Sequence, residues 1–148
     1  MTYHFPSTYR NPAKIKPATH VYDTKLPTDA EQITPIQGIT PASLPEWRVA
    51  MALYKTGYEF IFQQSVYNGP TPVTIIDYLV LNAGPLPVPL FEDGEEWHIT
   101  RNATSDEYKR GQLNKIMYGR YAKFKVIWEF DAPSIPVAMT NVRKVLNG

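Results

Sequence analysis

A dense group of acidic residues is the first feature of the sequence that could carry chemistry. Four carboxylates fall within the five positions 92–96, and no arginine or lysine follows them before Arg101. Carboxylate oxygens at the end of a strand are the ligands that a hard cation such as Mg²⁺ prefers. His98 follows directly and is within reach as a general base. The group therefore indicates metal-assisted acid–base chemistry, with a solvated acidic turn as the alternative.

Two further acids occupy unusual places. Asp77 lies in the apolar stretch 73–81, where strand alternation predicts that Val73, Ile75, Asp77 and Leu79 share one face. A lone buried acid is costly unless it is paired or binds a metal, so Asp77 is either a metal ligand or part of a structural ion pair. Glu46 precedes a helical apolar stripe and is expected on or beside its inward side, although a first-turn acid favoured by the helix dipole explains it equally well.

The surrounding elements follow from periodicity and from breakers. Ser43 is a plausible N-cap for a helix over 46–56, and Gly57 is a stop signal. The same reasoning predicts strands over 58–67, 72–81 and 86–93, a loop over 94–104, a helix over 105–119 capped by Ser105, a strand over 123–130 and a helix over 135–146. This order favours an α/β fold, a mixed sheet of about four strands flanked by helices.

Composition limits the classes of protein to consider. The chain has 148 residues, 43% of them apolar, a net charge of +1 and no cysteine. One globular domain is expected, without disulfides or a thiolate zinc site. No apolar run reaches the roughly 18 residues of a membrane span, and the first residues lack the apolar stretch of a secretory signal. An intracellular, cytoplasmic protein without a membrane partner is therefore expected.

Prolines mark the first part of the chain. Seven of the fourteen lie in residues 1–45, so a long helix or a central strand is not expected there. Residues 1–44 are predicted to form an extended proline-rich arm that lies along its own domain or along a partner protein, with a disordered leader as the alternative. Residues 45–148 form the predicted domain.

A basic segment could hold a nucleic acid. Residues 109–125 contain six basic side chains and no acid, and such a patch binds phosphates by releasing counterions. Lysines solvated on a helix and the following strand are the ordinary alternative. The predicted DNA-binding residues are Lys109, Arg110, Lys115, Arg120, Lys123 and Lys125.

Three motifs together resemble a known family. They are P-E-W-R-V-A-M-A-L (45–53), I-I-D-Y (75–78) and F-E-D-G-E-E-W-H (91–98). With the order of elements, they make residues 45–146 similar to the very-short-patch-repair-endonuclease-like branch of the PD-(D/E)XK nuclease superfamily. The resemblance covers about two-thirds of the chain and implies a restriction-endonuclease-like fold.

The resemblance also implies roles for individual residues. Asp77 matches the family's metal-binding aspartate, and Glu46 matches the helix carboxylate that supports the metal or its water. His98 matches the histidine that acts as the base, and Asp93 takes the neighbouring polar position. Bound Mg²⁺ would activate water and offset charge on the scissile phosphate.

The chain also departs from the family pattern. The position of the motif acid falls on Phe91, and no lysine follows it. Glu92 or Asp93 could replace the lost carboxylate as a metal ligand, but Glu92 is expected on the sheet face opposite to Phe91. The zinc-binding cysteines of the repair enzymes are missing from the sequence, so substrate specificity does not transfer.

Two functions follow from these residues. The first is a Mg²⁺-dependent DNA endonuclease in which Asp77, Glu46 and His98 are catalytic. The alternative is a catalytically inactive nuclease-like fold that serves as a structural or assembly protein, for example in a phage particle, docked through residues 1–44; its location would then be the virion. A small-molecule enzyme is a third class, for which no glycine-rich phosphate loop, serine elbow or histidine pair is found.

Overall fold

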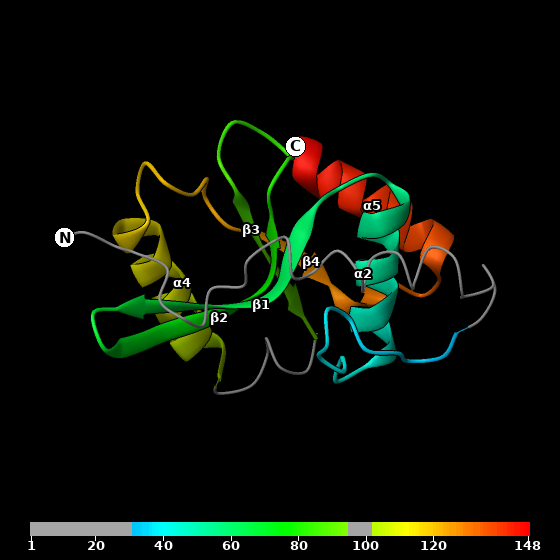
Figure 1. Cartoon of the computed structure of the whole chain (residues 1–148), viewed down its shortest axis with the longest axis horizontal. Coiled ribbons are helices and arrows are strands. Elements are labelled where there is room, and N and C mark those ends of the chain that lie inside the picture. The colour runs from blue at the N-terminus through cyan, green and yellow to red at the C-terminus, as the bar shows by residue number, and fades with distance from the viewer. Residues whose placement is uncertain (1–30, 95–101) are drawn as a thin grey trace.

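The computed structural model describes residues 31–94 and 102–148, and it has the predicted order of elements (Figure 1). The elements are α2 (Leu44–Lys55), β1 (Phe60–Asn68), β2 (Thr71–Val80), β3 (Val88–Asp93), α4 (Asn102–Ile116), β4 (Lys125–Trp128), the single 3₁₀ turn η2 (Glu129–Asp131) and α5 (Ile135–Asn147). An α/β fold is thereby confirmed. No helix in the described ranges has both the length and the apolar character needed to cross a bilayer.

The sheet is mixed and its strands follow chain order. β1 pairs with β2 and β2 with β3 in antiparallel fashion, whereas β3 pairs with β4 in parallel. The parallel pair needs a long crossover, and α4 supplies it. The carboxyl ends of β3 and β4 consequently lie at the same edge, where Asp93 is paired with Trp128.

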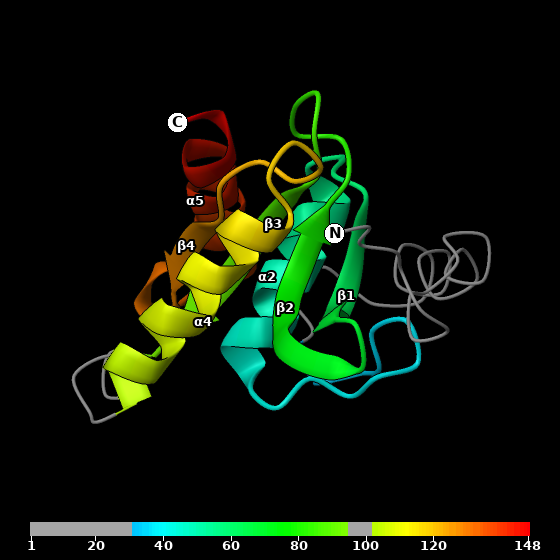
Figure 2. The ribbon, with the colours of Figure 1, turned by 90° about the vertical axis from the view of Figure 1, so that its left-hand side faces the viewer.

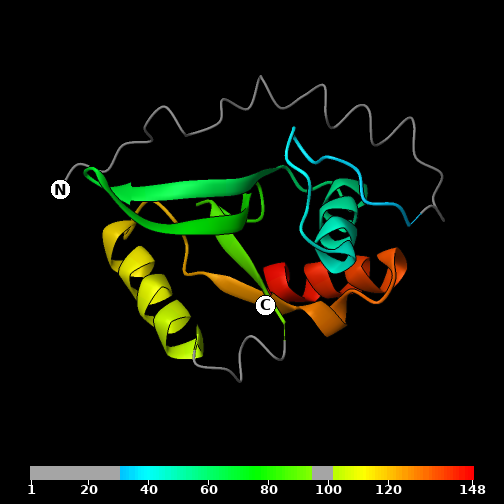
Figure 3. The same ribbon diagram turned by 90° about the horizontal axis from the view of Figure 1, so that it is seen from below.

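Helices cover both faces of the sheet (Figure 2). α4 lies across one face, and α2 and α5 pack together on the other, an arrangement also visible from below (Figure 3). Two groups of buried side chains correspond to these layers. The α2/α5-side core includes Trp47, Leu53 and Phe62, and the α4-side core includes Leu113 and Phe91.

The predicted N-cap of α2 is confirmed, although the helix begins at Leu44 and not at residue 46. The Ser43 hydroxyl accepts a hydrogen bond from the Glu46 N–H at 3.3 Å. The buried surface of α2 is wider than one amphipathic stripe, because Trp47 and all of residues 49–53 are buried. The extra burial follows from contacts on more than one side of the helix.

Residues 31–43 supply part of that cover. Ile36 is fully buried in the α2/α5-side core, and the Trp47 indole N–H donates to Thr34 Oγ1 at 3.0 Å. The Gln37 amide donates to the Phe60 carbonyl at 2.8 Å and accepts from the Phe62 N–H at 2.7 Å. The Gln37 side chain therefore provides hydrogen-bond partners for two backbone groups on the outer edge of β1. The described part of the predicted arm lies along its own domain.

Several boundaries differ from the prediction, as α4 and β4 illustrate. α4 begins at Asn102 rather than at Ser105, so the predicted loop over 94–104 is too long. β4 ends at Trp128, where the backbone turns into η2, and the predicted strand over 123–130 is too long at both ends. The Asp131 carboxylate accepts from the Trp128 N–H at 3.0 Å, which stabilises the turn that ends the strand.

Candidate functional site

The regular alternation of side chains along β2 is interrupted at Asp77. Ile76 and Leu79 pack in the α4-side core, whereas Tyr78 packs in the α2/α5-side core. Ile76 and Tyr78 would share a face in a regular strand, so the pleat is interrupted between them. On β1, Gln63 lies between the partners of these two residues and has a φ of 54°, in the left-handed region. The interruption therefore involves both strands.

The predicted alternation around Asp77 is wrong for this reason. Ile75 was expected to share a buried face with Leu79, but its side chain is 57% exposed and Ile76 takes the buried place. Asp77 instead directs its carboxylate toward β3, where Oδ2 accepts a hydrogen bond from the Glu92 N–H at 2.8 Å. The backbone pairing of β2 with β3 begins only at Tyr78, so the Asp77 side chain extends the connection between the two strands.

Glu92 faces α2, as alternation from the buried Phe91 predicts. Its Oε1 atom lies 3.1 Å from the Tyr78 hydroxyl, which in turn lies 2.8 Å from the Glu46 carbonyl oxygen. The second oxygen, Oε2, is buried and has no hydrogen-bond partner among the described residues. Because a buried polar atom is costly without a partner, the Oε2 atom of Glu92 is a place where a ligand would be favoured.

The side chains of Glu92 and Asp77 line a cavity of about 280 Å³, here called the acidic cavity. It lies where the N-terminus of α2 meets the ends of β3 and β4. Four of its six lining residues are acids. The lining residues are Ser43, Glu46, Asp77, Glu92, Gly94 and Glu129.

The charges in the acidic cavity are mutually unfavourable. Burial raises the pKa of Asp77 to about 7, and the nearby Glu46 carboxylate raises it further, against the hydrogen bond from Glu92. Burial, followed by the charges of Glu46 and Asp77, raises the pKa of Glu92 to about 9. Burial also raises the pKa of Glu46, against a hydrogen bond from Ser43. The charge of Arg110 lowers the pKa of Asp77, but this effect is smaller than those of burial and of Glu46, and the guanidinium is hydrogen-bonded to Asp93.

A second cavity adjoins the first and is called the α4-side cavity. It has a volume of about 200 Å³ and shares Asp77 and Glu92 with the acidic cavity. Two of its other lining residues, Lys109 and Arg110, are cations on α4. The full lining is Thr74, Ile75, Asp77, Phe91, Glu92, Asp93, Lys109 and Arg110.

Asp93 and Arg110 face each other in this second cavity. The guanidinium makes two hydrogen bonds to the carboxylate, one of them at 2.8 Å, and both side chains are almost fully buried. Arg110 also stacks 4.3 Å from the centre of the Phe91 ring. Arg110 is therefore part of the buried interior rather than of an exposed basic patch. The carboxylate of Asp93, predicted to bind metal, is instead neutralised by a guanidinium.

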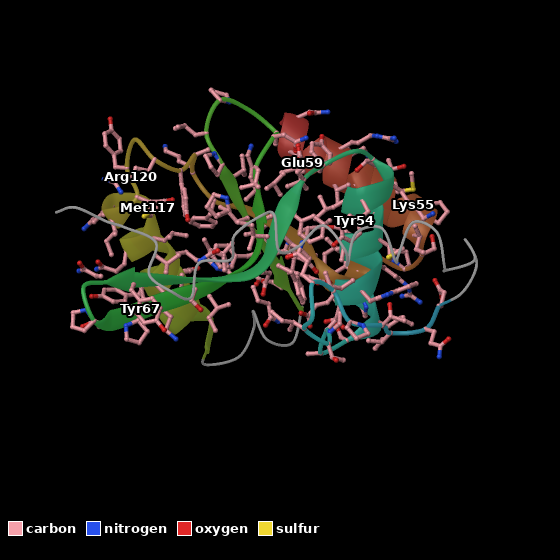
Figure 4. All side chains as sticks on the ribbon, viewed as in Figure 1. Tyr54, Lys55, Glu59, Tyr67, Met117 and Arg120 are labelled. Atoms are coloured by element: carbon pink, nitrogen blue, oxygen red, sulfur yellow. The ribbon has the colours of Figure 1, made fainter. Side chains whose placement is uncertain are left out.

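The other predicted basic residues lie on α4, in the segment that follows it and at the start of β4. Lys109, Lys115 and Lys123 are exposed. Arg120 is also exposed and lies beside Met117 near the end of α4, far from α2 (Figure 4). Lys125 is half-buried and donates to the Gly148 carbonyl at 3.1 Å. Of the predicted DNA-binding residues, Lys109 alone joins Arg110 in lining the α4-side cavity.

His98, the predicted base, lies outside the described residues. The structure brings together Glu46, Asp77 and Glu92 from the predicted set, and it places Asp93 in the α4-side cavity. Within residues 31–94 and 102–148, no three acidic or histidine side chains form a ready-made metal site. The acidic cavity therefore offers ligands from three elements without presenting them as a finished coordination shell.

Sequence reasoning missed Glu129. This residue directly follows β4, lines the acidic cavity, and its charge raises the pKa values of Glu46 and Glu92. A signal was available, because carboxyl ends of parallel neighbouring strands meet at one edge of a sheet. An acid after β4 is thus placed beside the acids that end β3. Because the predicted strand extended to residue 130, Glu129 was expected inside the strand and not at its end.

Comparisons of the chain with protein-family models, with curated proteins and with solved structures gave no match.

Proposed function

We propose that the protein is a Mg²⁺-dependent DNA endonuclease of restriction-endonuclease-like type, which hydrolyses phosphodiester bonds at the acidic cavity. The observation that carries the proposal is the meeting of Glu46, Asp77 and Glu92 in this cavity, with one buried oxygen of Glu92 that has no hydrogen-bond partner among the described residues. The mixed four-stranded sheet with helices on both faces supports the fold assignment. The resemblance of the three motifs supplies the substrate class.

The cavity residues suit a divalent cation in their chemistry. Their donors are carboxylate oxygens, which Mg²⁺ prefers, and their raised pKa values reflect burial and neighbouring acids, both of which disfavour the ionised forms until a cation is bound. Asp77 and Glu92 are the proposed ligands, with Glu46 holding the metal or its water. Bound Mg²⁺ supplies a Lewis acid and lowers the pKa of a coordinated water.

Glu92 takes the place of the family's missing acid in this proposal. The motif position itself, Phe91, packs in the α4-side core and does not reach the acidic cavity. Its neighbour Glu92 faces the cavity from β3 and is adjacent to Asp77 through the 2.8 Å hydrogen bond. A shift of one residue along β3 moves the carboxylate to the α2 side of the sheet, and this side is also that of Glu46.

The chain's remaining groups have separate tasks. Lys109 lines the cavity that shares Asp77 and Glu92, so its ammonium is placed to bind an oxygen of the scissile phosphate. Lys115 and Lys123 are exposed on the same side and would bind flanking phosphates. His98 is proposed to accept the proton of the attacking water, as the resemblance implies.

A second candidate function is an inactive nuclease-like fold in an assembly. The observation that favours it is Phe91, whose burial removes a carboxylate from the motif position, together with the neutralisation of Asp93 by Arg110. In this case residues 1–44 would dock the domain onto a partner protein, for example in a virion, and the acidic cavity would have no catalytic use.

Nicking of supercoiled DNA by the full-length chain tests the first proposal. We expect nicking with Mg²⁺ or Mn²⁺ and none with EDTA. Asp77→Asn, Glu92→Gln and His98→Ala should each lower the rate at least a hundredfold. Glu59→Gln is the matched control, because Glu59 is an exposed acid outside the cavity.

Two outcomes decide between the candidates. Cleavage that survives both Asp77→Asn and Glu92→Gln would place the chemistry elsewhere and overturn the proposed site. A parent protein without cleavage, and without metal heat in a calorimetric titration, would instead favour the assembly role.

A further inference from the structure

Trp128 and Phe130 form a stacked aromatic pair at the end of β4. Their ring centres are 5.6 Å apart and the ring planes differ by 11°. Phe130 is 61% exposed, so much of its surface remains open to solvent. A large apolar ring held parallel to a second ring, with one face uncovered, has the shape of a stacking platform.

The pair lies at the edge of the sheet where β3 and β4 end, beside residues that line the acidic cavity. Glu129 separates the two aromatic residues along the chain and itself lines that cavity. Trp128 is the pairing partner of Asp93, the last residue of β3. The next residue, Gly94, also lines the cavity. The aromatic pair is therefore connected to the candidate site through both neighbouring strand ends.

We propose that Phe130 stacks on an unpaired nucleobase beside the cleaved phosphodiester bond, so that the substrate is single-stranded or frayed at this place. The inference rests on the proposed nuclease function and adds the form of the substrate to it. A base within a duplex already stacks on both faces, whereas an unpaired base offers one to the protein. Stacking on an aromatic side chain accepts every base, because each base has a π face.

A nucleobase fits this position better than an apolar protein partner. Phe130 lies between Glu129 and Asp131 along the chain, so its exposed ring is a single apolar surface flanked by acids in the sequence. Glu129 connects it to the acidic cavity, which it lines. One flat apolar ring matches a single base and not a continuous apolar surface.

Fluorescence of 2-aminopurine in an oligonucleotide tests the platform directly, because stacking quenches it. The probe is used as a single strand and as the same sequence in a duplex, with Mg²⁺ and with the Asp77→Asn chain to prevent cleavage. We expect quenching and tighter binding for the single strand. Phe130→Ala should weaken single-strand binding about tenfold, Phe130→Leu nearly as much, and Phe130→Trp little.

Tyr118→Ala is the matched control, since Tyr118 is a large aromatic that is 88% exposed and lines neither cavity. It should leave binding and quenching unchanged. If the parent chain cleaves DNA but Phe130→Ala binds the single strand as tightly as its parent, the platform is wrong while the nuclease function stands. If the parent chain neither cleaves DNA nor binds either probe, both proposals are overturned.

Discussion

Two neighbouring acids on β3 have opposite environments. Asp93 faces α4, and Arg110 neutralises it with two hydrogen bonds in the protein interior. Glu92 faces α2, where its neighbours are other acids and one of its oxygens has no partner among the described residues. The two side chains are adjacent in sequence, yet the α4 side forms a closed ion pair and the α2 side gathers like charges.

The difference separates a structural acid from a candidate functional acid. A buried charge with its own counterion belongs to the stability of the fold, because removal of either partner leaves the other uncompensated. A group of acids without a counterion costs stability, and such groups are typical of sites that bind an external cation or carry out chemistry. Opposite stability effects are therefore expected from mutations on the two sides.

Removal of Arg110 should give the largest effect. Arg110→Met leaves Asp93 buried without its counterion, and we expect a loss of about 3–5 kcal/mol in the free energy of unfolding. Urea denaturation measures it. The double variant Asp93→Leu with Arg110→Met removes both charges and should recover much of the loss. A single variant that unfolds like the parent would show that the ion pair contributes nothing to stability. The contrast drawn between Asp93 and Glu92 would then be wrong.

Neutralisation on the α2 side should have the opposite sign. Glu92→Gln removes the cost of protonating this carboxyl when the chain folds, since its pKa is raised to about 9, and it keeps an oxygen that can accept from Tyr78. Without metal at pH 8, we expect a gain on the order of 1 kcal/mol in the free energy of unfolding. Glu59→Gln, an exposed control, should change it by less than about 0.5 kcal/mol. A marked loss in Glu92→Gln would indicate an unrecognised partner for this carboxylate.

The same acids predict how stability depends on pH. Burial raises the pKa of Asp77 from 3.8 to about 7 and that of Glu92 from 4.5 to about 9. Over this range the folded state retains protons that the unfolded chain has released, so the free energy of unfolding falls as pH rises from about 4 to about 9. Melting temperatures in EDTA across this range measure the fall.

Two additions sharpen the pH measurement. Glu92→Gln should show a shallower fall, because one of the two titrating groups is gone. Mn²⁺ should raise the melting temperature more at pH 8 than at pH 5.5, since metal competes with protons for the carboxylates. An equal effect at both pH values would argue against metal binding by these groups.

The smallest stability effects are expected at the surface lysines. Lys109→Ala and Lys115→Ala should each change the free energy of unfolding by less than about 0.5 kcal/mol, because both side chains are exposed. They should differ in function, since Lys109 lines the α4-side cavity and Lys115 does not. Lys109→Ala should lower the nicking rate, whereas Lys115→Ala should lower only the affinity for DNA, and most strongly at low salt. Equal rates for the two variants would remove Lys109 from the site.

Much of the fold was predictable because its signals are local. Ser43 caps α2 as its position before a helical apolar pattern indicates, and the order of helices and strands follows from periodicity and breakers. The opposite orientation of Phe91 and Glu92 follows from strand alternation alone. The predicted start of α4 is three residues too late, because Ser105 was expected to cap it.

The sequence by itself determined which residues alternate, where elements begin, and that Asp77 is an acid in an apolar strand. Only the tertiary structure decided which acids have a counterion. Arg110 is 17 residues from Asp93, and the packing of α4 on the sheet brings them together. The interruption of the pleat at Asp77 and the approach of Glu129 to the acidic cavity likewise depend on how separate elements meet. Local patterns repeat along one element and carry no record of its neighbours, so contacts between elements are fixed only when the core packs.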